Sequence, residues 1–298
     1  MTDKELLDLL PPIPEDAHKY QRGSLLVVGG SRRYFGAPVM TALAAERTGA
    51  GYVSLAVPPS IEKSAQAHLL TVPIITASDE EHEDAFAPKA LDQFQAQLKH
   101  LDAVAYGPGL SAHPNNRQLL KDLLSANNLP LVIDASGLFL LSQLLSDQTA
   151  ADSSAASKPT PLRPDPEAWW TIILTPHAGE LATLLKATGA ANASQLAQKL
   201  KVTVVSKGPE TVISAASKDW ASNSGTVGMA KAGSGDVLTG IIAALIAQGA
   251  PTEDAARLGV EIHGRSGRLA EQQTSRRSMV ARDIIECIPE IMRRVEGI

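Results

Sequence analysis

The sequence predicts an α/β fold in which a mostly parallel central sheet is covered by helices on both faces. Short apolar runs alternate with longer helical patterns along most of the chain, as in repeated βαβ units. Polar and glycine-rich segments stand directly after the apolar runs. Because ligands of such sheets bind beyond the carboxyl ends of the strands, we expect the functional residues in these post-strand loops.

The predicted strands are short apolar or β-branched runs that end at turn residues. The first run, residues 24–28, ends in Gly29-Gly30, and the run at residues 202–205 precedes a further one at 212–214. The other strands are expected at residues 52–57, 72–75, 103–106, 131–133 and 171–174.

Helical patterns fill most of the segments between these strands. They are expected at residues 37–48, 61–69, 115–126, 137–145, 237–247, 252–271 and 281–295. Residues 146–167 are rich in Ser, Ala and Pro without periodicity, so we expect an exposed insertion there. The insertion is too short for a second domain, and residues 1–298 are therefore expected to form a single domain.

The composition is that of a soluble globular protein. Of the 298 residues, 44% are apolar and 20% are charged, which excludes disordered and fibrous classes. The net charge of −5 and the scattered Lys and Arg residues argue against nucleic-acid binding. No uncharged apolar run reaches membrane-spanning length, which argues against a membrane protein.

The cysteine content and the N-terminal segment predict a cytoplasmic protein. The single cysteine, Cys287, excludes an internal disulfide and a cysteine-rich zinc site, and its apolar helical surroundings place it in the core. Residues 1–16 carry acids and prolines where a signal peptide needs a basic start and an apolar segment. A reducing compartment is the simplest setting that fits these features.

The glycine-rich stretch at residues 225–240 is the most informative part of the chain. Its Gly233-Ser234-Gly235-Asp236 turn stands at the start of the apolar helix predicted at residues 237–247. Unpaired N–H groups and the positive end of a helix dipole bind anions, most often phosphate, and an acid beside them can accept a proton from a hydroxyl group. In the alternative interpretation, Asp236 is an ordinary helix cap after a flexible loop.

Three other post-strand segments carry candidate residues, each with a structural alternative. Lys207 opens a KGPET segment that suits a nucleotide phosphate or forms a hairpin turn between two strands. His177 in TPHAGE is a candidate substrate contact or a hydrogen-bonded structural residue, and with Glu180 it supplies too few ligands for zinc. Asp134 either acts at the site or caps the helix after it.

The order of the motifs resembles that of the ADP- or ATP-dependent NAD(P)H-hydrate dehydratases, which have the ribokinase-like fold. The series is RGSLLVVGGS with GAP, then GPG, TPHAGE, KGPET and NSGTVGMAKAGSGDVLTGIIAALIAQG, and it covers residues 19–249. The last block is the most specific. The resemblance therefore implies a ribokinase-like domain with one site at the strand ends.

The resemblance also implies roles for individual residues. Asp236 would be the catalytic base, and the N–H groups of Gly233, Ser234 and Gly235 would form the anion hole. The hydrated dinucleotide would be contacted by Ala37, Gly109, His177 and Asp236. The adenine nucleotide would be bound by Lys207, Gly208, Pro209, Glu210, Thr211 and Gly235.

The implied reaction is the dehydration of hydrated NADH or NADPH, driven by ADP or ATP with Mg²⁺. Phosphoryl transfer would replace hydroxide, a poor leaving group, by phosphate, which leaves readily. The resemblance favours ADP as the nucleotide and a homotetramer as the assembly. The alternatives are a small-molecule kinase of the hydroxyethylthiazole or pyridoxal type, and a non-catalytic nucleotide-binding protein.

Some features depart from the family pattern. Ala178 stands where the family usually has proline in TPHAGE, and Asp134 is followed by Ser-Gly where an Ala-Asp-like pattern is common, which leaves the role of Asp134 open. The insertion at residues 146–167 is also unusual. Some relatives carry an N-terminal epimerase domain, which we expect to be missing because the first predicted strand begins at Ser24.

Overall fold

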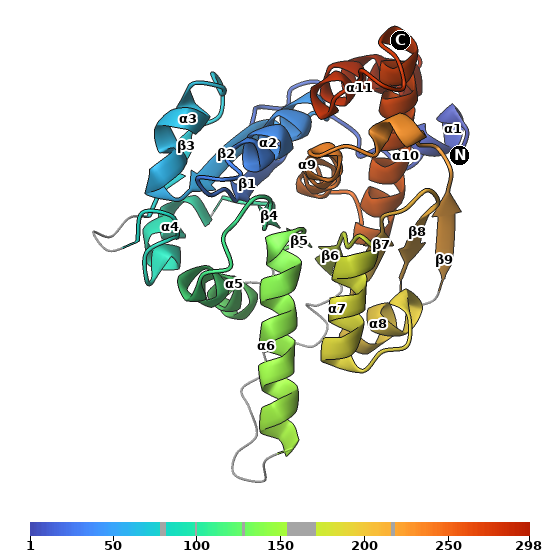
Figure 1. The fold of residues 1–298 in the computed structure, drawn as a ribbon. Helices are drawn as coiled ribbons and strands as arrows, with labels where there is room; N and C mark the ends of the chain where they lie inside the picture. Colours follow the sequence, from blue (N-terminus) through green and yellow to red (C-terminus); the bar gives the residue numbers. More distant parts are fainter. Residues whose placement is uncertain (78–81, 99, 127–128, 154–170, 216–217) are drawn as a thin grey trace.

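The central feature of the fold is a sheet whose strands are mostly parallel (Figure 1). The computed structural model describes residues 1–77, 82–98, 100–126, 129–153, 171–215 and 218–298. Within these residues the sheet has nine strands in the order β3-β2-β1-β4-β5-β6-β7-β8-β9. Neighbouring strands from β3 to β7 in this order pair in parallel, whereas β8 pairs antiparallel with both β7 and β9. The predicted α/β class is confirmed.

Most strands lie where the apolar runs predicted them. The strands are β1 (Ser24–Val28), β2 (Tyr52–Val57), β3 (Ile74–Thr76), β4 (Ala103–Tyr106), β5 (Leu131–Ile133), β6 (Ile172–Leu174), β7 (Thr203–Ser206), β8 (Thr211–Ser214) and β9 (Asp219–Ser222). The prediction missed β9, whose DWAS sequence forms no apolar run and whose side chains are exposed or half-buried. The turn between β7 and β8 is the hairpin that the KGPET segment also allowed.

The helices cover both faces of the sheet, as predicted (Figure 1). One apolar core lies against α2 (Gly36–Arg47), α9 (Ser234–Ala247), α10 (Thr252–Gln273) and α11 (Ala281–Val295), which contains buried Cys287. The other core lies against α4 (Ala90–Leu98), α5 (Pro114–Ala126), α6 (Ser136–Ser153), α7 (Ala178–Thr188) and α8 (Ala193–Leu200). Shorter helical segments are α1 (Asp3–Leu7), η1 (Pro59–Ile61), α3 (Glu62–Gln66) and η3 (Val227–Met229).

The predicted insertion at residues 146–167 begins inside a helix. Helix α6 extends to Ser153, and Figure 1 shows its C-terminal part projecting beyond the neighbouring helices. The Ser146 hydroxyl donates to the Ser142 carbonyl at 2.9 Å, so serine side chains here satisfy the helix backbone itself. The remaining residues, 154–167, lie outside the described part of the chain.

None of the helices in the described ranges combines the length and the apolarity that a membrane-spanning helix requires.

Helix α9 is the central helix of the fold because it is apolar and buried on nearly every side. Every residue from Val237 to Ala247 is buried. A Cβ atom on Gly240 would lie 2.2 Å from the Thr41 carbonyl oxygen and 2.9 Å from the Ala44 Cβ. Glycine at this position therefore lets the backbones of α9 and α2 approach closely.

We expect Gly240→Ala to destabilise the protein by about 1–3 kcal/mol, because the added methyl group forces the two helices apart. The free energy of unfolding from urea denaturation measures the effect. Gly36→Ala is the matched control, since no atom lies within 4 Å of a Cβ added there. Equal stability of the two variants would contradict the role given to Gly240.

Candidate functional site

The loops that follow the central strands meet at one edge of the sheet. Strands β1, β4, β5, β6 and β7 are neighbours in the sheet and parallel, so their carboxyl ends lie side by side. The Gly30 N–H donates to the Pro108 carbonyl at 2.8 Å, and the Ser31 hydroxyl donates to the Gly109 carbonyl at 2.7 Å. The predicted post-strand residues therefore gather at a single site.

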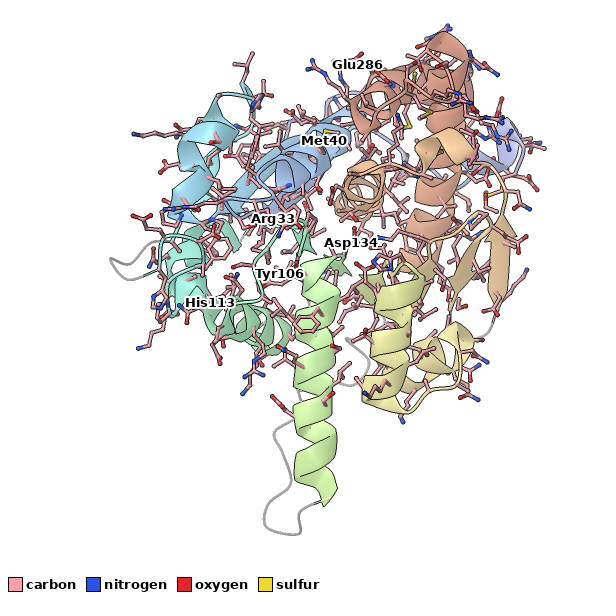
Figure 2. The ribbon with its side chains drawn as sticks, in the orientation of Figure 1. Arg33, Met40, Tyr106, His113, Asp134 and Glu286 are labelled. Atoms are coloured by element: carbon pink, nitrogen blue, oxygen red, sulfur yellow. The ribbon has the colours of Figure 1, made fainter. Side chains whose placement is uncertain are left out.

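An ion pair between Asp134 and Lys207 lies at the centre of this site. The Lys207 Nζ is 2.6 Å from Asp134 Oδ1, and Asp134 Oδ2 accepts a hydrogen bond from the Thr239 hydroxyl at 2.7 Å. Figure 2 shows Asp134 at the N-terminal end of α6, close to α9 in that view. Its carboxylate binds these two groups instead of capping α6, so the capping interpretation is wrong and the side chain links the end of β5 to Lys207 and α9.

The first turn of α9 faces the same ion pair. Gly233 precedes the helix with φ 91°, which glycine adopts without strain, and it offers no side chain as a cap. A Cβ atom added to Gly235 would lie 3.2 Å from Lys207 Nζ. Asp236 is the third residue of α9, inside the helix and past the N-cap position that Gly233 occupies. The interpretation of Asp236 as an ordinary cap is therefore wrong.

The surroundings of Asp236 favour its protonated form. Loss of water around the carboxylate raises its pKa to about 7, and the negative charges of Asp134 and Glu180 also raise it, whereas the Lys207 ammonium lowers it. A carboxyl group with a pKa near neutrality exchanges a proton readily at working pH. The Asp236 carboxyl group is therefore able to take up or release a proton near neutral pH.

Lys207 keeps its charge in this setting. Burial alone would lower the pKa of its ammonium group, but the carboxylates of Asp134 and Glu180 raise the pKa above its ordinary value. The Glu180 Oε2 lies 3.9 Å from Lys207 Nζ. The cation is therefore held between two carboxylates and beside the first turn of α9.

One of the three N–H groups of the predicted anion hole, that of Ser234, already has a hydrogen-bond acceptor. The Ser234 N–H donates to the Lys231 carbonyl at 3.3 Å, and the Ser234 hydroxyl lies 3.3 Å from Nε2 of His263 on α10. The N–H groups of Gly235 and Asp236 belong to the first helical turn, which has no preceding turn to supply acceptors. These two groups, more than that of Ser234, are placed to receive an anion.

Two of the predicted substrate residues lie together beside α9. A Cβ atom on Gly109 would lie 3.0 Å from the Ala37 Cβ, so the loop after β4 touches the start of α2. The Thr41 hydroxyl lies 3.1 Å from both the Ala37 and the Asp236 carbonyl oxygens. Ala37, Gly109 and Asp236 thus form one side of the site.

His177 has a structural role, and its ring stays largely exposed with Nε2 3.4 Å from Glu180 Oε1. It is the N-cap of α7, where its Nδ1 accepts from the Gly179 and Glu180 N–H groups at 3.0 and 3.3 Å, and Glu180 Oε2 accepts from the His177 N–H at 2.8 Å. The His177 side chain is 61% exposed, and its backbone bridges that of Lys207. The residue is placed at the site by the helix that it caps.

The remaining KGPET residues lie on the turn between β7 and β8. Gly208, Pro209 and Glu210 are exposed, and Thr211 begins β8. Glu210 accepts a hydrogen bond from Asn223 at 3.2 Å, which ties this turn to the end of β9. Of the nucleotide-binding residues implied by the resemblance, Lys207 approaches Gly235 with its side chain, 3.2 Å from the position of an added Cβ.

The sequence did not identify Thr239, Thr41 or His263 as members of the site. Thr239 and Thr41 lie within apolar helices, and the one available signal is a polar residue on an otherwise buried face. Loss of water around the ring lowers the pKa of His263 to about 4, so its imidazole is neutral at physiological pH.

The described residues hold no group of three or more His, Cys, Asp or Glu side chains able to bind a metal ion. Both oxygens of Asp134 already accept hydrogen bonds. A magnesium ion at this site would accordingly take most of its ligands from nucleotide phosphates and water, as Mg²⁺ commonly does.

Comparison with known proteins gives the family of the chain. Residues 25–290 match the profile of the NAD(P)H-hydrate dehydratase family. The chain belongs to this family. The bifunctional NAD(P)H-hydrate repair enzyme of Moorella thermoacetica is 36% identical over 296 residues, which cover 96% of this chain and 52% of that protein. The chain therefore spans about half the length of the curated relatives that it matches.

Solved structures confirm the ribokinase-like fold of this dehydratase family member. A ribokinase-like superfamily protein of Enterococcus faecalis superimposes with a TM-score of 0.77 and 23% identity, over 99% of this chain and 95% of that one. The ADP/ATP-dependent NAD(P)H-hydrate dehydratase of Bacillus subtilis, co-crystallised with ATP/Mg²⁺, superimposes with a TM-score of 0.74 and 23% identity. The match covers 99% of this chain and 97% of that one. The fold implied by the motif order is thus confirmed.

We expect Asp236→Asn to raise the free energy of unfolding more at pH 8 than at pH 5. The folded protein holds the Asp236 proton up to a pKa of about 7, against an ordinary value of 3.8, so the stability that this group contributes is lost as the pH rises through this window. Urea denaturation at both pH values tests this. Asp147→Asn, on the exposed surface of α6, controls for loss of a carboxylate, and a pH-independent effect of Asp236→Asn would contradict the raised pKa.

Proposed function

We propose that the protein is an ADP-dependent (S)-NAD(P)H-hydrate dehydratase, a hydro-lyase that restores NADH or NADPH from the hydrated dinucleotides and releases AMP and phosphate. The observation that carries the proposal is a partly buried carboxyl group, Asp236, at the start of α9 beside the Lys207 ammonium. In a chain of the dehydratase family, this arrangement supplies a base next to an anion-binding helix terminus.

The proposed chemistry proceeds in two steps. The substrate hydroxyl oxygen attacks the terminal phosphorus of the nucleotide, the bond from that phosphorus to the bridging oxygen breaks, and Asp236 accepts the hydroxyl proton. The ring nitrogen then donates its lone pair while the carbon–oxygen bond breaks and phosphate leaves. Loss of a proton from the neighbouring ring carbon restores the double bond, so the net change to the dinucleotide is loss of water.

The chain's own residues position the reactants. The N–H groups of Gly235 and Asp236 would hold the transferred phosphate, with that of Gly233 at the edge of the anion hole. Ala37, Gly109 and the largely exposed ring of His177 would line the dinucleotide site. Lys207 and the turn from Gly208 to Thr211 would bind the adenine nucleotide. Magnesium bound to the nucleotide phosphates would neutralise part of their charge.

Several finer features belong to the same proposal. We propose one ribokinase-like domain over residues 1–298, ADP in preference to ATP, a homotetrameric assembly and a cytoplasmic location. The nucleotide preference and the assembly rest on the family membership of the chain. The single domain rests on the shortness of residues 146–167, and the location on the single cysteine, Cys287. Use of an adenine nucleotide is further supported by the similarity to the ADP/ATP-dependent dehydratase of Bacillus subtilis.

The proposal is tested with hydrated NADH and NADPH, magnesium, and either ADP or ATP. We expect the near-ultraviolet absorbance of the dihydronicotinamide to return together with release of free phosphate, and to return faster with ADP. A phosphorylated product without phosphate release would instead identify a small-molecule kinase. Nucleotide binding without turnover would identify a non-catalytic binding protein.

We expect Asp236→Asn to lower kcat by about 10²- to 10⁴-fold, because the amide cannot accept the hydroxyl proton. Its affinity for ADP, measured by calorimetry, should stay close to that of the wild type. The control is Asp147→Asn, which removes an exposed carboxylate from α6 and should leave kcat unchanged. Near-normal turnover by Asp236→Asn would disprove its assignment as the base.

A further inference from the structure

The Lys207 side chain does not extend into solvent from the turn that carries it. Its ammonium lies 2.6 Å from Asp134, and the two side chains are only 20% and 1% exposed. The Lys207 N–H donates to the Pro176 carbonyl at 2.8 Å, so the backbone of the residue is also fixed. Lys207 is therefore held in one direction, toward the interior of the site.

Asp134 is fixed from two sides. One oxygen receives the Lys207 ammonium, and the other accepts from the Thr239 hydroxyl at 2.7 Å. The Thr239 hydroxyl also lies 3.1 Å from the Gly235 carbonyl oxygen. Because both oxygens are engaged, Asp134 is poorly placed to act as a base or as a metal ligand. It instead connects Lys207, after β7, to Thr239 on α9.

The held ammonium lies at the anion-binding turn. Lys207 Nζ is 3.2 Å from the point where a Cβ on Gly235 would stand, so glycine leaves the space that the lysine uses. The charged groups around this point are Asp134 after β5, Glu180 on α7 and Asp236 on α9, with neutral His263 on α10 behind Ser234. Lys207 is the cation that these carboxylates share.

We propose that Asp134 is a positioning residue that directs the Lys207 ammonium onto the terminal phosphate of the bound nucleotide, at the Gly235 turn. Lys207 would then stabilise the negative charge on the phosphoryl group during its transfer. It would contribute little to the binding of the adenosine part of the nucleotide. The proposal rests on the proposed nucleotide-driven function. Without Asp134, the Lys207 ammonium would keep Glu180 at 3.9 Å as a partner, but its side chain would have no fixed direction.

The test compares the binding of ADP and AMP in the presence of magnesium, measured by calorimetry. AMP lacks the terminal phosphate, so a cation directed at that phosphate contributes to ADP binding alone. We expect Lys207→Met and Asp134→Asn each to weaken ADP binding by about 10- to 100-fold, the range of a hydrogen bond to a charged group, and to leave AMP binding within about twofold. Asp147→Asn, an exposed Asp→Asn change on α6, should alter neither.

The double variant separates positioning from a general structural role. If Asp134 acts through Lys207, adding Asp134→Asn to Lys207→Met should weaken ADP binding no further. Equal weakening of ADP and AMP, additive effects of the two substitutions, or unchanged ADP binding in Asp134→Asn would each overturn the proposal. Should Asp134→Asn fail to fold, Thr239→Val loosens the same carboxylate and should weaken ADP binding in the same direction by a smaller factor.

Catalysis gives a second readout that a merely structural role would not produce. The Asp134 carboxylate raises the pKa of Asp236 and the Lys207 ammonium lowers it. The acid limb of kcat/KM should therefore move to lower pH in Asp134→Asn and to higher pH in Lys207→Met, and shifts in the same direction would count against the proposal. If the wild type binds ADP but does not dehydrate the substrate, the proposed function fails, while the ADP and AMP comparison still decides the role of Asp134.

Discussion

The buried ion pair between Asp134 and Lys207 is the interaction on which the site depends. It joins the ends of β5 and β7 to α9 through the Thr239 hydroxyl. A charge removed from water is tolerated only when a partner and further hydrogen bonds compensate for the lost hydration, and each oxygen of Asp134 has such a bond. The pair and the Thr239 hydrogen bond therefore link the sheet to the helix and set the direction of the lysine.

Close packing of α9 against α2 makes this arrangement possible. Gly240 brings the α9 backbone against that of α2, and Thr41 on α2 then reaches the Asp236 carbonyl oxygen at 3.1 Å. The first turn of α9 is thereby held between the strand ends on one side and α2 on the other. An apolar helix with glycines at its contacts can be buried this deeply because its charged group is confined to its first turn.

The charged groups at the site have opposite effects on the pKa of Asp236. Loss of water and two neighbouring carboxylates raise the pKa of Asp236, while Lys207 limits that rise to about 7. His263 adds no charge at physiological pH, since its pKa is lowered to about 4. The site thus combines a carboxyl group with a pKa near neutrality, a charged lysine between carboxylates and the N–H groups of a helix terminus. The proposed phosphoryl transfer would use all three.

The sequence by itself determined the class of the fold, most strand positions and the motifs at their ends. Apolar runs and glycine turns are local patterns, so β1 (Ser24–Val28) and the GSGD turn could be predicted from the sequence without knowledge of the fold. Only the tertiary structure showed that Asp134 and Lys207 meet, because residues 73 positions apart in the chain come together through sheet order and helix packing. It likewise showed the Ser234 N–H to be engaged and the first part of the supposed insertion, residues 146–153, to be helix. Hydrogen bonds and pKa shifts depend on distances between residues that are far apart in the chain. A local sequence pattern gives no information on those distances.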